Sequence, residues 1–168
     1  MTRSALPIRC LPDQDLSIDE VVALAGAGTS QRVSLYLPTH AAGRDVAQDP
    51  IRFRGLIKLA AEETEDPATL DAVRELADDA EFWAHGSAGL GVLADEEGAT
   101  AIRLSAEVGE LAVVSDRFHL KPLLAAVRRA RECHVLALSR HAVRLVHAIG
   151  GTTAEIAVPD LPAGIDDA

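Results

Sequence analysis

The chain has 168 residues, 26 acidic against 16 basic side chains, and a formal net charge of −10. Its hydrophobic fraction of 48% is sufficient for a packed core, which excludes a disordered chain. No apolar run approaches the roughly 20 residues of a membrane-spanning helix, and the first residues lead into no apolar targeting segment. We therefore expect a cytoplasmic protein without a membrane partner. Cys10 and Cys133 match no metal-ligand spacing, so two reduced, buried thiols are expected.

Charge is distributed unevenly along the chain. Residues 66–115 carry eleven acidic and two basic residues, a net charge of −9, whereas residues 116–147 carry seven basic and two acidic residues, a net charge of +5. The acidic total argues against a DNA-binding protein or a general nucleic-acid coat, because phosphate binding depends on clustered Lys and Arg. The basic segment nevertheless permits an anionic partner on one face.

The first half of the chain predicts two helices and a strand. Ser17 and Glu20 have the spacing of a capping box at the start of a short helix. Residues 33–37 alternate apolar and polar side chains until Pro38, which predicts a half-buried strand. Asp49 before Pro50 is typical of a cap residue at a helix start.

The second half predicts a longer series of elements. Asp66 and Pro67 begin a helix that is expected to continue to about Trp83. Residues 90–94 and 99–104 flank a polar turn and predict a hairpin, followed by a strand over 111–115 and a helix over 120–131. Arg128, Arg129 and Arg131 would complement the negative end of that last helix.

Three strands in a row, over residues 134–138, 143–149 and 153–158, predict a β-meander with a tight turn at Gly150-Gly151. The fold class is therefore α/β (α+β), a mixed sheet packed with about four helices and followed by this meander. The expected division is residues 1–132 and 133–168. Three strands alone make a poor core, so the meander either adds to the first sheet or opens a second domain.

The densest polar cluster lies between a strand and a helix N-terminus, a junction that can bind an anion. It contains Asp116, Arg117, His119 and Lys121. The equally weighted alternative is that Asp116 is only a helix cap or polar anchor and that the rest is surface. His40 follows a strand end, where functional groups gather, but nothing in the sequence shows that it meets His119 or Asp116.

The remaining polar and aromatic residues match no known site. Phe82 and Trp83 are expected in the core rather than as a base-stacking platform. His134, His141 and His147 have no metal-ligand spacing. No phosphate-binding glycine loop, nucleophile elbow or dinucleotide motif is present in the sequence. We therefore expect no catalytic residue, metal or cofactor.

Five segments in order resemble the N-terminal region of the bacterial archaeo-eukaryotic release factor family. They are Val33-Ser34-Leu35-Tyr36-Leu37-Pro38-Thr39-His40, Asp49-Pro50-Ile51-Arg52, Phe82-Trp83 with Ser87 and Gly89-Leu90, Asp116-Arg117-Phe118-His119-Leu120-Lys121-Pro122-Leu123-Leu124, and Leu136-Ala137-Leu138-Ser139. The resemblance implies a release-factor-like α/β domain, the start of a ribonuclease H-like middle domain in a truncated chain, and ribosome association.

The chain departs from true release factors in residues that matter for activity. Their catalytic Gly-Gly-Gln loop is missing, because Gly150-Gly151 is followed by Thr152. The codon-reading motif is also missing. The strand over His134 to Ser139 has no carboxylate for a nuclease metal. Peptidyl-tRNA hydrolysis, stop-codon recognition and nuclease activity are therefore not expected.

These observations favour a non-enzymatic translation module that contacts the ribosome or structured RNA. Its expected contact face uses His40, Arg44, Arg52, Arg117, His119 and Lys121. One alternative is a protein-interaction domain that binds itself through unpaired meander edges. The other is a hydrolase that binds a small phosphorylated ligand beside Asp116, His119 and Lys121.

Overall fold

A computed structural model describes residues 7–26, 30–129, 133–149 and 152–158. The chain divides into two compact units, residues 1–127 and 128–168. The expected fold class is confirmed, because a mixed five-stranded sheet with helices is followed by a separate three-stranded antiparallel sheet. Gly150-Gly151, the tail after residue 158, Arg131 and the side chains of Arg128 and Arg129 lie outside the described part, and so do the predictions made for them.

The first unit is built on one sheet with the strand order β1-β4-β3-β2-β5. Its strands are β1 (Ile8–Pro12), β2 (Arg32–Pro38), β3 (Gly89–Asp95), β4 (Gly98–Leu104) and β5 (Leu111–Ser115). β1 runs parallel to β4, and the other neighbours are antiparallel. The hairpin of β3 and β4 and the strand β5 were predicted, whereas β1 was not.

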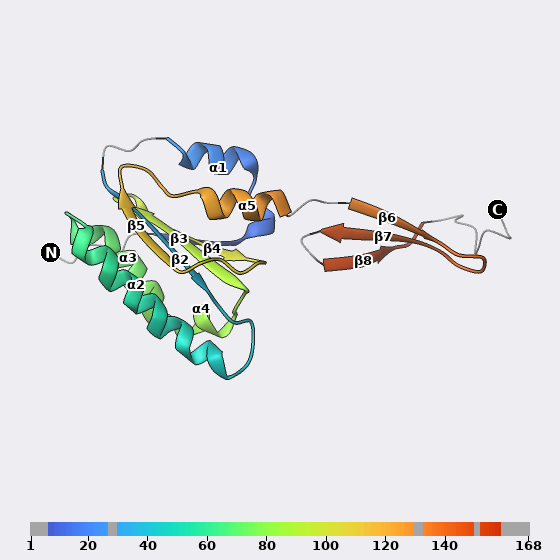
Figure 1. Cartoon of the computed structure of the whole chain (residues 1–168), viewed down its shortest axis with the longest axis horizontal. Coiled ribbons are helices and arrows are strands. Elements are labelled where there is room, and N and C mark those ends of the chain that lie inside the picture. Colours follow the sequence, from blue (N-terminus) through green and yellow to red (C-terminus); the bar gives the residue numbers. More distant parts are fainter. Residues whose placement is uncertain (1–6, 27–29, 130–132, 150–151, 159–168) are drawn as a thin grey trace. The chain divides into compact units, whose positions relative to one another are not determined.

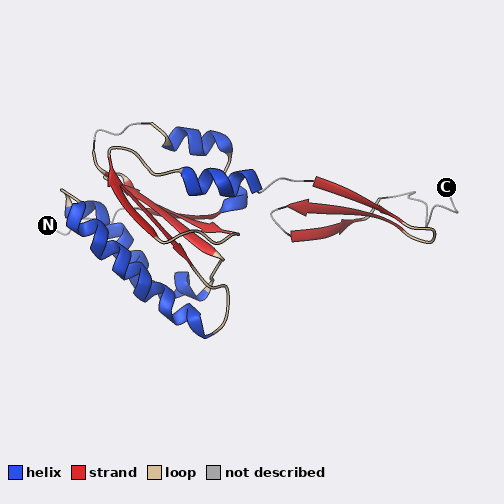
Figure 2. Cartoon of the chain, viewed as in Figure 1, coloured by secondary structure: helices blue, strands red, loops and turns tan. Residues whose placement is uncertain are grey.

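Helices cover both faces of this sheet, with α2 and α3 on one face and α1 and α5 on the other (Figure 1; Figure 2). They are α1 (Ile18–Leu24), α2 (Asp49–Glu63), α3 (Asp71–Asp78), α4 (Ala80–Ala84) and α5 (Lys121–Arg129), with short 3₁₀ helices η1 (Asp13–Asp15), η2 (Arg44–Gln48) and η3 (Pro67–Leu70). The capping box of α1 is confirmed: Glu20 N donates to Ser17 Oγ (3.1 Å) and Ser17 N to Glu20 Oε2 (2.9 Å).

Strand β2 lies at the centre of two hydrophobic cores. Val33, Leu35 and Leu37 pack on the face of α2 and α3, where Phe53 and Leu56 complete the core. Tyr36 packs on the opposite face with residues of α1 and α5. The prediction of a half-buried strand is wrong, because Ser34 and Tyr36 are fully buried. Both faces of β2 are therefore buried, and the face that carries Ser34 and Tyr36 bears their hydroxyl groups.

The helix predicted from Asp66 to Trp83 is interrupted. Asp66 accepts a hydrogen bond from Ala68 N (3.0 Å), as a cap should, but a 3₁₀ turn follows before α3 begins. Asp79 has extended backbone angles and accepts from Glu81 N and Phe82 N (2.9 and 3.0 Å), so it caps a separate helix, α4. A second N-cap inside the run therefore ends α3 and starts a new helix.

Two further expectations about side chains are settled by the structure. Phe82 and Trp83 are core residues, as predicted: Trp83 lies 5.4 Å from Phe53 between ring centroids and donates from Nε1 to Leu76 O (2.9 Å). The expected burial of the cysteines is wrong, because Cys10 and Cys133 are both exposed. Cys10 lies on the outer strand β1, where half of the side chains face away from the core.

The second unit is the predicted meander. Its strands β6 (Cys133–Leu138), β7 (Val143–Ile149) and β8 (Thr152–Ile156) pair in chain order, all antiparallel. His134 and His147 lie directly opposite each other, with stacked rings whose centroids are 5.0 Å apart. No helix is present within residues 133–149 and 152–158.

Candidate functional site

The six candidate contact residues belong to two separate groups. His40 and Arg52 lie on the α2 face of the sheet, where both contact residues at the end of β2 or on α2. His119 instead bonds to Ser34 and Tyr36, whose side chains point to the opposite face. The single contact face expected from the sequence is therefore replaced by two groups, and His40, His119 and Asp116 do not form an acid/base set.

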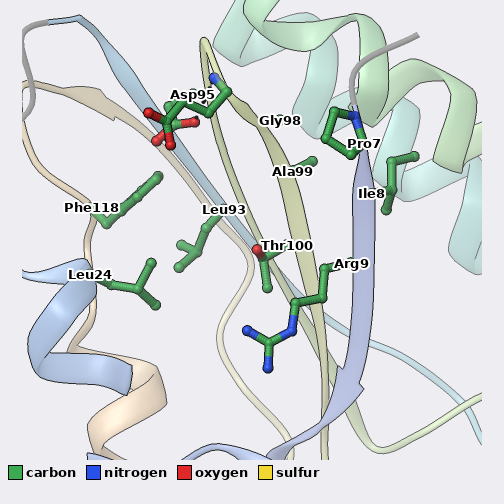
Figure 3. A pocket seen from close by; sticks show the side chains of 11 residues that line it. Pro7, Ile8, Arg9, Leu24, Leu93, Asp95, Gly98, Ala99, Thr100 and Phe118 are labelled. Atoms are coloured by element: carbon green, nitrogen blue, oxygen red, sulfur yellow. Dashed lines mark hydrogen bonds between the residues drawn. The ribbon is translucent and has the colours of Figure 1, made fainter. Parts of the chain in front are cut away.

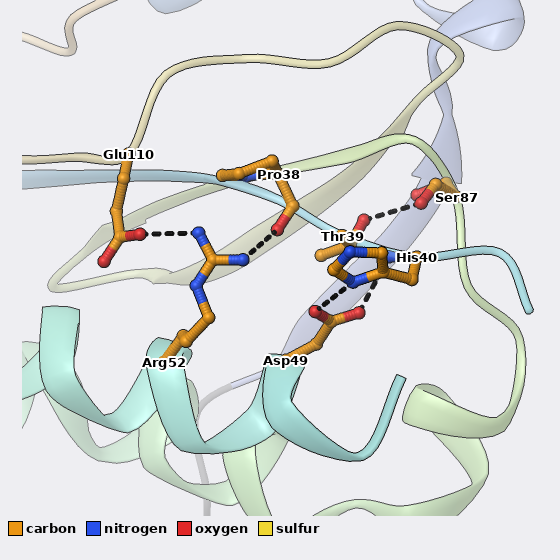
Figure 4. Close-up of polar contacts among 7 residues, drawn as sticks. All are labelled: Pro38, Thr39, His40, Asp49, Arg52, Ser87 and Glu110. Atoms are coloured by element: carbon orange, nitrogen blue, oxygen red, sulfur yellow. Dashed lines mark hydrogen bonds and ion pairs between the residues drawn. The ribbon is translucent and has the colours of Figure 1, made fainter. Parts of the chain in front are cut away.

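His40 is held by a buried carboxylate at the start of α2. His40 N donates to Asp49 Oδ2 (2.8 Å), and His40 Nδ1 lies 2.8 Å from Asp49 Oδ1 (Figure 4). Asp49 is 1% exposed, whereas the His40 side chain is 40% exposed. The predicted cap role of Asp49 is wrong, because Gln48 is the N-cap of α2 and Asp49 lies in its first turn. Its carboxylate instead fixes both the backbone and the ring of His40.

The chain segment beside His40 is joined to the loop before β3. Thr39 Oγ1 donates to Ser87 O (2.8 Å), and Thr39 N donates to Ala88 O (3.2 Å). Gly86 lies so close to the His40 carbonyl that a Cβ atom there would collide with the backbone. The segment around His40 is therefore packed tightly against the loop that precedes β3.

Arg52 uses its charge in contacts with other residues of the chain. Its guanidinium donates from Nη2 to Glu110 Oε2 (2.7 Å) and from Nη1 to Pro38 O (3.3 Å), as Figure 4 shows. These contacts connect α2 to the end of β2 and to the residue before β5. Arg44 lies exposed in η2. The side chains of His40 and Arg44 are the more exposed members of this group.

The segment over residues 116–121, called here the basic loop, is fixed to β2 by its backbone. His119 N donates to Ser34 Oγ (2.9 Å), and Tyr36 Oη donates to His119 O (2.6 Å). Burial raises the pKa of the Tyr36 phenol. Arg32 stacks on the Phe118 ring, 4.7 Å from its centroid. It also donates to the carbonyls of Leu24, the last residue of α1, and of Gly26. Sequence reasoning did not identify Ser34 and Tyr36, the two residues of β2 whose hydroxyl groups hold this loop.

The charged side chains of the basic loop point away from these anchors. The Arg117 side chain is 66% exposed, with Nε 3.8 Å from Asp116 Oδ2, and Lys121 is exposed. Asp116 accepts from Ser115 Oγ (3.1 Å) and lies before α5, which begins only at Lys121. Asp116 therefore does not cap α5, which was one of the two alternatives, and its carboxylate instead contacts Ser115 and Arg117. Because His119 N is already bonded to Ser34, it does not offer its N–H to a phosphate.

A groove of about 300 Å³ borders the basic loop at Phe118 (Figure 3). It is lined by Pro7, Ile8, Arg9, Leu24, Leu93, Asp95, Glu97, Gly98, Ala99, Thr100 and Phe118. Arg9, Thr100 and Leu93 lie in one row across three strands, and Arg9 also pairs with Glu20 (2.9 Å). None of the predicted contact residues lines this groove.

No group of three or more potential metal ligands occurs within the residues that the structure describes. In the same residues, no helix is long and apolar enough to cross a membrane.

Comparisons with known proteins do not assign the chain to a family. No family model and no curated protein matches it. Among solved structures it is similar to a chain described as "Archaeal protein", with a TM-score of 0.48 and 15% identity, and the match covers 92% of this chain and 47% of that one. This chain thus spans about half the length of that protein. The resemblance to the release factor family remains a prediction.

Proposed function

We propose that the chain is a non-enzymatic module that contacts structured RNA of the ribosome through the basic loop. The observation that carries the proposal is the contrast between Arg117 and four other arginines of the first unit. Arg9, Arg52, Arg54 and Arg74 make ion pairs of 2.7–2.9 Å with carboxylates. Arg117 has only a 3.8 Å contact and is 66% exposed, so its charge, with that of Lys121, is available to a phosphate.

The anchoring of the basic loop also supports this proposal. The two hydrogen bonds of His119 to β2 hold the loop backbone on a buried strand. A cationic side chain on a rigid backbone loses less conformational entropy on binding than one on a free loop. The release-factor resemblance includes this same segment and gives the ribosome as the expected partner.

Co-sedimentation with bacterial 70S ribosomes and separated subunits, at low and moderate salt, tests the proposal. The double variant Arg117→Glu/Lys121→Glu should lower the bound fraction about tenfold at low salt, and binding of the unchanged chain should weaken steeply with salt. Lys121→Glu is compatible with folding, because an acidic residue is favourable in the first turn of α5.

A matched control distinguishes an effect of the basic loop on binding from an effect of the total charge of the chain. Lys58→Glu/Arg74→Glu makes the same charge change on α2 and α3. Lys58 is solvent-exposed, and Arg74 is in an exposed ion pair. This control should bind within about twofold of the unchanged chain. Equal co-sedimentation of the basic-loop variant and the unchanged chain, or equal losses in both variants, would overturn the proposal.

A further inference from the structure

The aromatic side chains of the chain bear on which form of RNA the basic loop binds. The sequence has three Phe, one Tyr and one Trp, and the structure describes all of them. Tyr36, Phe53 and Phe82 are 7% exposed or less, and Trp83 packs against both Phe53 and Phe82. Unpaired RNA bases are usually bound by stacking on aromatic rings. Because four of these five rings belong to the core, Phe118 is the one that lies where a base could reach it.

Phe118 lies in the basic loop, and its ring already contacts the first unit. The Arg32 guanidinium stacks on the ring, 4.7 Å from its centroid, and the ring also packs against the core on this face of the sheet. The neighbouring His119 ring meets Tyr36 edge to face, with 6.3 Å between the ring centroids. A base would have to displace these contacts in order to stack. The two rings of the basic loop therefore serve to pack it against β2 and its surroundings.

The groove beside Phe118 has the wrong charge for a nucleotide. Asp95 and Glu97 line it together with Phe118 (Figure 3). Arg9, the basic residue of the lining, is already paired with Glu20 (2.9 Å). A base inserted into this groove would bring its phosphate towards two carboxylates, and like charges repel. Insertion of an unstacked base beside the basic loop is therefore unfavourable.

The outward side chains of the basic loop fit phosphates instead. Arg117 is 66% exposed and Lys121 is exposed, and both carry a positive charge. Contacts to phosphates fix the position of a protein on a nucleic acid and do not read sequence. A duplex presents its phosphates on a stiff helix, whereas a single strand must be ordered on binding and usually gains base stacking in return.

We propose that the basic loop binds the sugar–phosphate backbone of double-stranded RNA without reading its sequence. This inference rests on the RNA contact proposed above and names the form of RNA that makes it. The net charge of −10 keeps most of the chain away from phosphates. The contact is therefore confined to the basic loop and is sensitive to salt.

Fluorescence anisotropy with end-labelled RNA and the full chain tests this inference. The probes are two duplexes of different sequence, each of about 16 base pairs, and one unpaired strand of the same length. At about 50 mM salt the two duplexes should bind with Kd values within about twofold of each other, and the single strand at least tenfold more weakly. The neutral variant Arg117→Gln/Lys121→Gln should reduce the slope of log Kd against log salt by about 2, because each phosphate contact contributes about 0.9.

Two conservative variants distinguish phosphate contact from base stacking. Phe118→Leu removes the ring and keeps an apolar side chain. Arg117→Lys keeps the charge and removes the planar guanidinium, which can itself stack on a base. Both variants should bind the duplexes within about threefold of the unchanged chain. Urea unfolding followed by Trp83 fluorescence establishes that each variant is folded under the binding conditions.

The outcomes distinguish failure of this inference from failure of the ribosome contact. Backbone recognition is overturned if the single strand binds as tightly as the duplexes, if the two duplexes differ tenfold or more, or if a folded Phe118→Leu or Arg117→Lys variant loses tenfold or more. A chain that co-sediments with ribosomes through the basic loop but binds none of the three RNAs would also overturn it, and the ribosome contact would stand. Failure of the co-sedimentation test with its matched control would overturn both.

Discussion

The two polar groups attached to β2 use their side chains in opposite ways. At the end of the strand, the charges of Asp49 and Arg52 are used in contacts within the chain, which join α2 to β2, to His40 and to Glu110. In the basic loop, the backbone of His119 makes the joint, and the side chains of Arg117 and Lys121 remain outside. A conspicuous polar motif can thus serve to hold two segments of the fold together, and the charged side chains that such contacts leave unused are the better candidates for binding.

The largest effect on stability is expected for Asp49→Ala, which tests the contacts at the end of β2. The substitution removes the acceptor of two hydrogen bonds from His40 in a buried position, so the free energy of unfolding should fall by about 3 kcal/mol. Urea unfolding followed by the fluorescence of Trp83, the single tryptophan, measures this loss. Asp78→Ala, which removes a 75% exposed partner of Arg54, should cost less than about 1 kcal/mol. Equal losses would mean that the His40 joint does not stabilise the fold.

A second test of the same joint is Gly86→Ala. A Cβ atom at Gly86 would collide with the His40 carbonyl, and the backbone shift that relieves such a clash should cost about 2 kcal/mol. Gly55→Ala is the matched control, because a Cβ atom at Gly55 in α2 meets nothing within 4 Å. That control should stabilise the protein by about 0.5–1 kcal/mol. The same urea experiment should show a lower free energy of unfolding for Gly86→Ala and a higher one for Gly55→Ala.

Tyr36→Phe tests the hydroxyl anchor of the basic loop. The loss of the hydrogen bond to His119 O should cost about 1 kcal/mol at neutral pH. Burial raises the pKa of Tyr36 above its ordinary 10.0, so the phenol stays neutral in the folded chain while it ionises in the unfolded chain. Stability contributed below pH 10 is therefore lost as the pH rises above that value, and Tyr36→Phe should reduce this alkaline loss.

The alkaline prediction has a direct spectroscopic check. Tyr36 is the only tyrosine, so absorbance at tyrosinate wavelengths reports its ionisation alone. The phenol should titrate only together with unfolding, which is followed in parallel by Trp83 fluorescence. Ionisation near pH 10 in the folded chain would contradict the buried anchor.

Sequence periodicity predicted most of the elements because caps and apolar spacing are local signals. Ser17 with Glu20 marked α1, and the turn before Gly98 marked the hairpin of β3 and β4. Periodicity did not predict β1, since its five residues have no clear alternation and include Pro12. It also could not separate α3 from α4, because the cap at Asp79 lies within a continuous helical pattern.

The candidate site was harder to predict because its contacts join residues far apart in the sequence. Arg117, His119 and Lys121 were found from their charge, but Ser34 and Tyr36 were assigned to a solvated strand face. A hydroxyl in an alternating strand has the same sequence signal whether it meets water or a backbone group of another segment. Only the two helical layers over β2 decide between these cases.

The smallest expected effect on stability is that of Arg117→Glu/Lys121→Glu. Both side chains are exposed, and the only ion pair they lose is the 3.8 Å contact of Arg117 with Asp116, so the free energy of unfolding should change by less than about 0.5 kcal/mol. The same urea experiment measures it, beside the large loss for Asp49→Ala. A loss above about 1.5 kcal/mol would mean that these charges belong to the fold, as those of Asp49 and Arg52 do. An unchanged stability together with reduced ribosome binding would instead show that the two groups have different roles. Asp49 and Arg52 would stabilise the packing around β2, and Arg117 and Lys121 would bind the partner.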